Sequence, residues 1–355
     1  MSQKTKPQLI PGYEDRQCFR TPESTAALRW ENPLAYCRYV AEDTARRVAA
    51  SKDDFPHAFF RGDCHSHTQH SDGRGTVAET AAMAQAAELD FQFVTDHWGV
   101  TQAPECREHG LWVGQEPVTQ LHHMGILGLD YAFEPQHDFL ADYAAAVEAG
   151  ATVFIPHPTG WWPNVIYNQQ QQKILEALPS PFLMEICNGA NNIISAFDFT
   201  DESALALWDH LLCLGRRVHA MGNTDAHAPH GIGMVWNSVF AENCDQETIV
   251  AELKKGHHFV SDAPLIHIAL GKARMGDQAS LSDRKSELEV TVADSRGLAW
   301  LSVIVDGEEV FHLPFRGETA WRGSLEVPAQ AAKYVRVEVH SRDARRAYSN
   351  PIYLV

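Results

Sequence analysis

Short apolar runs alternate with helical patterns through the middle of the chain. The runs at residues 58–61, 91–95, 153–156, 182–186 and 218–221 are rich in β-branched, aromatic and other large apolar side chains. Such runs are typical of strands buried on both faces, and their alternation with helices is typical of parallel strands joined by crossover helices. Between the first two runs, Thr76 and Glu79 form a capping-box pattern that predicts the start of a helix. We therefore predict an α/β domain built on a parallel sheet.

The two ends of the chain follow other patterns. Residues 33–50 carry apolar side chains at helical spacing and predict a helix within an N-terminal arm, residues 1–57, that packs on the main domain. Residues 288–292 and 334–339 alternate polar and apolar positions, and Asp306-Gly307 follows the apolar run 301–305 as a hairpin turn would. The pattern predicts an α/β domain over residues 58–262 and an antiparallel β domain over residues 263–355.

Composition and charge narrow the classes of partner. The 355 residues are 45% hydrophobic, which is enough for more than one core. The formal net charge of −17 opposes polyanions, so we expect no nucleic-acid partner. The seven cysteines include no C-x-x-C pair, the first residues lack an apolar signal, and no segment approaches the roughly 20 apolar residues of a membrane span. We expect a cytoplasmic protein without a membrane partner, and leave homo-oligomer formation open.

Residue types that bind metal ions follow nearly every predicted strand. In chain order they are Asp63, His65, His67, Asp72, Asp96, His97, His157, Glu185, Asp225 and His227. The carboxyl ends of parallel strands meet on one face of a barrel, and an extended His-x-His segment points both imidazoles to one side. A ligand set of imidazoles and carboxylates without thiolates favours zinc, manganese, iron or a related ion. It also argues against a structural zinc site, in which protein ligands close the coordination sphere. The surplus of ligand types predicts two or three divalent ions around an open position.

The motifs resemble those of a known family. His65-x-His67-Thr-x-x-Ser71-Asp72-Gly73, Thr95-Asp96-His97 and Asp225-x-His227 resemble the motifs of the PHP (polymerase and histidinol phosphatase) superfamily. The segments 114–116 and 122–128, together with the C-terminal β domain, resemble the CehA/McbA-type branch most closely. The resemblance covers about residues 60–262. It implies a distorted (βα)7 barrel, followed by an antiparallel β-sandwich-like domain, and a trinuclear metal site.

The resemblance also implies a ligand set. One ion would be held by His65, His67, Glu116 and Asp225; a second would share Glu116 and take His123 and His157; a third would bind Asp72, His97 and His227. His122 is the alternative to His123, although the apolar run that follows favours His123. Glu185 and Asp96 are ambiguous, and we favour for them a role in orienting ligands or holding the fold.

Other residues are candidates for catalysis and substrate binding. A hydroxide bridging two ions is the expected nucleophile, because metals can lower the pKa of bound water to about 7. We assign catalytic roles to Asp225, Glu116 and His227, and Asp225 or a nearby histidine would return a proton to the leaving group. Arg74, His70 and His230 are candidates for binding an anionic group, with surface charge as the alternative. Trp161 and Trp162 follow His157. Their indole rings could form an aromatic side of the pocket for a flat substrate, and the alternative is ordinary core packing.

Three functions compete on this basis. The first is a phosphoesterase acting on small phosphate esters, indicated by the implied trinuclear site and Arg74. The second is a carboxylic or carbamate ester hydrolase, indicated by the branch resemblance and the tryptophans. The third is a metal-stabilised binding module without turnover. The complete ligand set favours a metal-dependent hydrolase with a small-molecule ester as its substrate.

Overall fold

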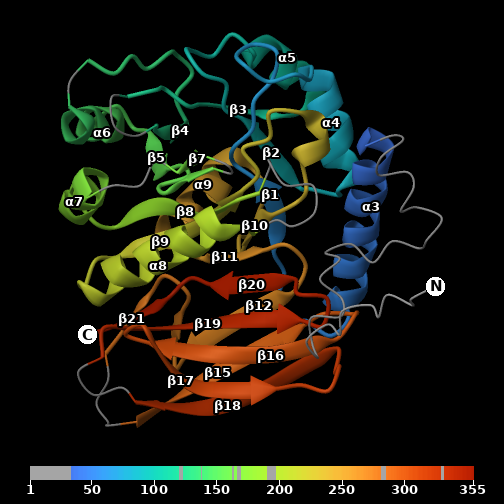
Figure 1. The fold of residues 1–355 in the computed structure, drawn as a ribbon, viewed down its shortest axis with the longest axis vertical. Coiled ribbons are helices and arrows are strands. Elements are labelled where there is room, and N and C mark those ends of the chain that lie inside the picture. The colour runs from blue at the N-terminus through green and yellow to red at the C-terminus, as the bar shows by residue number, and fades with distance from the viewer. Residues whose placement is uncertain are drawn as a thin grey trace, which may run out of the picture.

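The computed structural model describes residues 33–119, 123–136, 138–161, 164–165, 169–189, 197–280, 285–328 and 332–355. The chain forms two stacked parts: a mixed α/β part, and a C-terminal part made of antiparallel strands (Figure 1). No helix within these ranges combines the length and the apolar character that crossing a membrane requires. The six cysteines in the described ranges are free thiols.

Parallel strands form the centre of the α/β part. The strand order is β1-β2-β3-β4-β5-β8-β9, in which β4 runs antiparallel to both of its neighbours and the other strands share one direction. Their bounds are β1 (Phe60–Asp63), β2 (Phe91–Val94), β3 (Trp112–Gln115), β4 (Gly125–Leu127), β5 (Thr152–Ile155), β8 (Phe182–Asn188) and β9 (Val218–Asn223). All five predicted strands are confirmed to within two residues at each end. Strands β3 and β4 were not predicted.

Helices alternate with the strands of the α/β part, as the pattern predicted. They are α4 (Val77–Ala86), α5 (Ala103–His109), α6 (Phe139–Glu148), α7 (Gln169–Ala177), α8 (Phe199–Cys213) and α9 (Gln246–Lys255). The capping box is confirmed: the Thr76 hydroxyl accepts a hydrogen bond from the Glu79 amide at 3.1 Å, and the Glu79 carboxylate accepts from the Thr76 amide at 2.8 Å. Two amides at the start of α4 are thereby satisfied.

The sheet does not close through backbone pairing in the described residues. β10 (Trp236–Val239) pairs antiparallel with β1, β11 (His258–Ser261) pairs antiparallel with β10, and β9 ends the strand order. An amide side chain spans the gap instead: Asn237 on β10 accepts from the Gly222 amide at 3.0 Å and donates to the Gly222 carbonyl at 2.9 Å. The mixed α/β architecture is thus confirmed, and closure into a (βα)7 barrel stays a prediction.

The C-terminal part confirms the predicted antiparallel strands. One sheet holds β12 (Leu265–Leu270), β13 (Ala273–Arg274), β15 (Lys285–Ala293) and β18 (Ala320–Pro328). Facing it are β14 (Gln278–Ala279), β16 (Leu298–Val305), β17 (Glu308–Pro314), β19 (Tyr334–Ser341), β20 (Arg346–Ser349) and β21 (Ile352–Leu354). Both sheets contribute side chains to one apolar cluster. Asp306 and Gly307, with φ of 50° and 82°, form the predicted hairpin turn between β16 and β17.

The two parts are joined at two places. β20 pairs with β11, so the large sheet continues across the predicted domain boundary at residue 262. Helix α3 (Pro33–Lys52), which confirms the predicted N-terminal helix, lies beside α4 and reaches the C-terminal strands (Figure 1). Its Arg47 side chain is buried and bonded to Asp294 and Asp343 at 2.6–2.9 Å. Residues 1–32 of the predicted arm lie outside the described residues.

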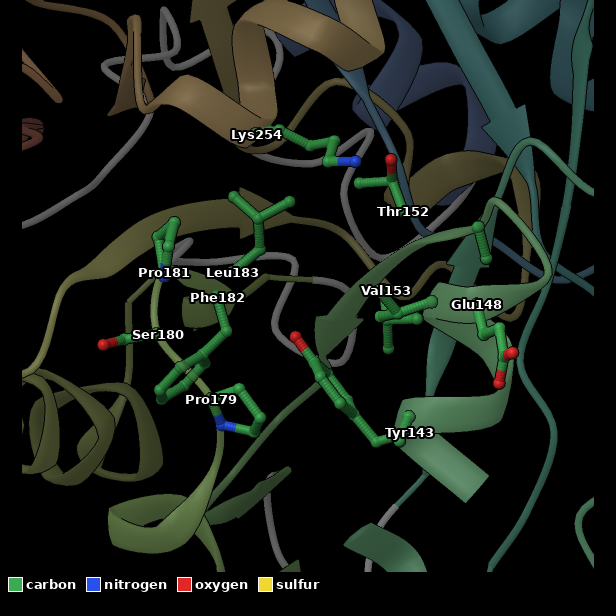
Figure 2. A pocket seen from close by; sticks show the side chains of 13 residues that line it. Tyr143, Glu148, Thr152, Val153, Pro179, Ser180, Pro181, Phe182, Leu183 and Lys254 are labelled. Carbon is green, nitrogen blue, oxygen red and sulfur yellow. The ribbon is translucent and has the colours of Figure 1, made fainter. Parts of the chain in front are cut away.

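One pocket lies at the amino ends of the parallel strands. It has a volume of about 370 Å³ and is lined mainly by apolar residues of α6, β5 and the segment before β8, with the Tyr143 hydroxyl pointing into it (Figure 2). None of the candidate metal ligands lines it. Those ligands follow the opposite, carboxyl ends of the strands.

Candidate metal centre

The segments after β1 and β9 come together and carry most of the candidate ligands. Ser66 and Ala226 form a parallel bridge, the His67 amide donates to the Ala226 carbonyl, and the Asp225 amide donates to the His65 carbonyl, both at 2.9 Å. Asp63 strengthens this junction by accepting from the backbone and side chain of Thr224. Burial raises the pKa of Asp63 to about 6, although these hydrogen bonds act to lower it.

Four of the predicted ligands form a compact buried group at this junction. Nε2 of His65 and Nε2 of His67 lie 3.1 Å apart, and each lies 3.0–3.2 Å from Glu116 Oε2 and from Asp225 Oδ1. Four tetrahedral ligands at about 2.0–2.1 Å from an ion are separated from one another by about 3.3 Å. The atoms of this group, which we call the inner group, therefore have the spacing of ligands around one cation.

The chemistry of the inner group also fits a cation. Nδ1 of His65 donates to the Glu185 carboxylate at 2.8 Å, which leaves a lone pair on Nε2 facing the two carboxylates. Asp225 Oδ1 is fully buried and has no hydrogen-bond partner among the described residues. Burial acts to lower the pKa of His67, but the nearby carboxylates of Asp225 and Glu116 outweigh it and raise that pKa to about 9. The group therefore requires extra protons or a metal ion, and a divalent ion satisfies all four atoms together.

Glu116 extends the centre to a second group. Its other oxygen, Oε1, lies 2.9 Å from His157 Nε2 and 3.0 Å from His123 Nδ1. One carboxylate thus faces two sets of imidazoles, which is the arrangement of a ligand that bridges two ions. His122, the alternative to His123, lies outside the described residues.

The third predicted group is more open. Asp72 Oδ1 lies 3.4 Å from His227 Nε2 and 3.8 Å from both His97 Nε2 and His67 Nδ1. Its side chain is 46% exposed, whereas those of the inner group are buried. Because His67 already faces the inner group with Nε2, we assign Asp72, His97 and His227 to this outer group. The chain thus brings all nine predicted ligands into one continuous cluster.

Neighbouring groups fix the orientation of the imidazoles. Nδ1 of His97 donates to the Glu116 carbonyl at 2.7 Å, and Nδ1 of His227 donates to the Asp225 carbonyl at 2.9 Å. A carbonyl only accepts, so Nδ1 carries the proton and Nε2 is free to bind a metal. His157 and Asp225 also adopt left-handed backbone conformations, with φ of 29° and 50°. Strain of this kind concentrates at functional sites.

Glu185 and Asp96 orient the centre from outside it. Besides His65, the Glu185 carboxylate accepts from the His157 amide at 2.7 Å and from the side chains of Asn188 and Asn223. Asn188 donates from the same amide to Asp225 Oδ2 at 3.2 Å. These contacts fit the orienting role that we favoured for Glu185.

Asp96 holds the loop that carries Asp72. Its carboxylate accepts from the Thr68 amide and hydroxyl, both at 2.7 Å, and from the Ser71 hydroxyl at 2.5 Å. These bonds leave Asp96 in the structural role that we favoured.

The predicted substrate-binding residues differ in position. The Arg74 amide donates to the His227 carbonyl at 2.8 Å, which places the Arg74 backbone beside the outer group; burial together with the Arg74 charge lowers the pKa of His230. Both ring nitrogens of His70 are engaged, by Glu105 at 3.0 Å and by Thr101 at 3.1 Å, which removes it as a free donor.

Trp161 lies beside the second group. Its ring is 4.9 Å from that of His157 and 6.1 Å from that of His123, and it is half-buried. Trp162 lies outside the described residues.

Sequence reasoning missed two kinds of residue. Asn188 and Asn223 were not singled out, although Asn188 stands three residues after Glu185 and Asn223 stands two residues before Asp225. Trp98 was also missed, although it directly follows the candidate ligand His97 and its ring lies 5.2 Å from the His97 ring. In each case the signal was adjacency to a ligand.

Comparisons with protein-family models and with curated proteins give no match. Among solved structures, the chain is similar to a two-domain protein from Bacteroides vulgatus that contains a predicted PHP-like metal-dependent phosphoesterase. The identity is 15%, with 84% of this chain and 96% of that chain covered and a TM-score of 0.48. It is also similar to the lesion-specific endonuclease EndoQ from Pyrococcus furiosus, with 14% identity, 56% of each chain covered and a TM-score of 0.42.

An amidohydrolase from Chromobacterium violaceum is similar at 16% identity, with 47% of this chain and 88% of that chain covered and a TM-score of 0.34. These three proteins carry different activities by name. Likeness at this level does not transfer function, so the function of this chain must be inferred from the side chains of its own centre.

Proposed function

We propose that this protein is a metal-dependent hydrolase with a PHP-type centre of two or three divalent ions, and that it cleaves small phosphate esters. The observation that carries the proposal is the bridging position of Glu116, whose two oxygens face separate sets of imidazoles. In this proposal the inner ion is held by His65, His67, Glu116 and Asp225, the second by Glu116, His123 and His157, and the outer one by Asp72, His97 and His227.

The chain's own residues suit the remaining tasks of hydrolysis. Bound ions would supply Lewis-acid activation of water and of the ester oxygen. Asn188 holds Asp225 from one side, so the carboxylate is positioned to take a proton from the attacking water and pass it to the leaving alcohol. His227 stands at the border of the inner and outer groups, but its Nδ1 donates to the Asp225 carbonyl and its Nε2 faces the outer group, so Asp225 is the better candidate for that transfer.

Two features favour a phosphate ester as the substrate. The Arg74 backbone lies beside the more open outer group, and His230 follows the outer ligand His227 by three residues, so both are candidates for binding an anionic substrate there. Several divalent ions also place positive charge in an otherwise acidic protein, which attracts a phosphate dianion locally.

The second candidate is a carboxylic or carbamate ester hydrolase of the CehA/McbA type. It is favoured by Trp161, whose half-buried ring beside His157 offers an apolar surface to a flat neutral ester.

A substrate panel with measured metal content tests the proposal. Protein loaded with zinc, manganese or iron is analysed for bound metal and assayed with 4-nitrophenyl phosphate, bis(4-nitrophenyl) phosphate, 4-nitrophenyl acetate and a naphthyl carbamate. We expect more than one bound ion and release of nitrophenol from a phosphate ester. The variant His67→Ala should lose metal and turnover, while His210→Ala, which changes a histidine 42% exposed on α8, should retain both.

The other outcomes each select an alternative. Turnover of only the acetate or the carbamate would favour the second candidate. Bound metal with no turnover of any ester would favour a metal-stabilised binding module. Absence of bound metal would refute the centre itself.

A further inference from the structure

Trp98 has an exposed side chain and a strained backbone conformation, and both are uncommon for a tryptophan. It lies four residues after the end of β2, its side chain is 72% exposed, and its φ is 60°. The left-handed region is disfavoured for large L-residues, and tryptophan normally buries most of its surface. Both features act against stability, which indicates that this ring is kept in place for another reason.

The loop that carries Trp98 is held on both sides. Before it, Asp96 is bonded to Thr68 and His97 is bonded to the Glu116 carbonyl. After it, the Gln102 side chain donates to the carbonyls of Val94 at 3.2 Å and Gly114 at 3.0 Å. The exposed ring therefore projects from an anchored segment, and a preorganised ring loses little entropy when it binds a ligand.

Trp98 stands at one end of a row of aromatic rings that crosses the centre. Successive ring centroids lie 5.2 Å apart from Trp98 to His97, 5.5 Å from His97 to His123 and 6.1 Å from His123 to Trp161. Trp161 is half-buried at the other end, so Trp98 offers the more accessible aromatic surface beside the metal ligands.

We propose that Trp98 is a substrate-binding residue whose indole stacks on a planar aromatic or heteroaromatic group of the ester. The inference rests on the proposed hydrolase function and deepens it: the substrate is a phosphate ester of a planar alcohol, with its phosphate at the outer group. Water attacks phosphorus, the bond between phosphorus and the aryl oxygen breaks, and one proton of the water passes to that oxygen, so that the products are hydrogen phosphate and the neutral aryl alcohol.

Binding of phosphonates tests this without turnover, because their carbon–phosphorus bond is not hydrolysed. Calorimetry on the metal-loaded full chain compares phenylphosphonate with methylphosphonate. We expect the wild type to prefer phenylphosphonate by roughly tenfold, the size of one stacking contact. The variant Trp98→Ala should lose this preference and bind methylphosphonate as the wild type does, while Trp98→Phe should restore most of it.

Two further variants guard against a structural explanation. Trp98→Gly, which suits the left-handed backbone, should lose the preference without losing metal or stability. Leu214→Ala removes another exposed apolar side chain, 52% exposed after α8, and should leave both affinities unchanged. The proposal is overturned if Trp98→Ala keeps the preference, or if it weakens both phosphonates equally.

Turnover separates this inference from the proposed function. With phenyl phosphate as substrate, Trp98→Ala should raise KM about tenfold, with methyl phosphate unaffected. If the wild type hydrolyses neither ester but still binds phenylphosphonate through Trp98, the hydrolase proposal fails and the binding role stands. If it hydrolyses both esters with equal kcat/KM and Trp98→Ala changes neither, the binding role fails and the hydrolase stands.

Discussion

Replacing Glu185 with glutamine should weaken metal binding without touching a metal ligand. Each oxygen of Glu185 accepts two hydrogen bonds. Oε1 accepts from His65 Nδ1 and from the Asn223 side chain, both at 2.8 Å. Oε2 accepts from the backbone N–H of His157 at 2.7 Å and from the Asn188 side chain at 3.1 Å. A glutamine side chain accepts only at its oxygen. Its NH2 group must therefore face two donors, whichever way the amide is turned.

Either orientation disturbs the centre. If the NH2 group faces His65, the imidazole must move its proton to Nε2, and the lone pair that faces the inner group is lost. If it faces the His157 amide, the strained turn at His157 must shift. Removing a carboxylate that orients a metal-bound histidine typically costs roughly 10- to 100-fold in metal affinity. The buried donors left unpaired should also lower the free energy of unfolding by about 2–4 kcal/mol.

Competition with a chromogenic chelator measures the affinity, and denaturant titration measures the stability. Glu105→Gln is the matched control, because Glu105 also contacts a histidine, His70 at 3.0 Å, but that histidine faces no metal ligand. We expect the control to stay close to the wild type. Zinc affinity of Glu185→Gln within about twofold of the wild type would refute this account of how His65 is oriented.

Four further predictions concern stability and metal content. Arg47→Met leaves Asp294 and Asp343 buried without their partner, so denaturant titration should show the free energy of unfolding lowered by about 4 kcal/mol. The exposed Arg38→Met is the control and should lower it by about 0.5 kcal/mol or less. Burial raises the pKa of Asp343 but the Arg47 charge outweighs it and lowers that pKa, so the stabilisation is present above pH of about 4 and should be lost as the pH falls through the lowered value. Chelation of metal should lower Tm by about 4 °C for each ion lost, measured by calorimetry and reversed on adding metal back, since loss of a ligand at a hundredfold its Kd removes about 2.7 kcal/mol and 355 residues unfold with an entropy of about 0.75 kcal/mol/K. Asp72→Asn should remove only the outer ion in metal analysis, and loss of every ion would contradict the division into groups.

The local pattern of the chain was sufficient for five strands of the α/β part and for most of the candidate ligands. Strands buried on both faces need continuous apolar runs, and helices need caps, so both leave a mark within a few residues. His65, His67, Asp225 and His227 were predicted because their spacing along an extended segment sets the direction of their side chains. Strand β10 was missed since its sequence, Trp-Asn-Ser-Val, is half polar, and its buried Asn237 is satisfied by Gly222 and Asn223 on β9, which lie far from it in the local pattern.

Only the tertiary structure decided how the ligands are shared and oriented. Glu185 stands 120 residues from His65, and Asp63 stands 161 residues from Thr224, so neither contact leaves a local pattern in the chain. The bridging position of Glu116 likewise depends on five histidines brought together from four segments. The sequence specifies which metal-binding side chains exist and to which side of its strand each one points. The free energy of packing the strands decides which of these side chains come together.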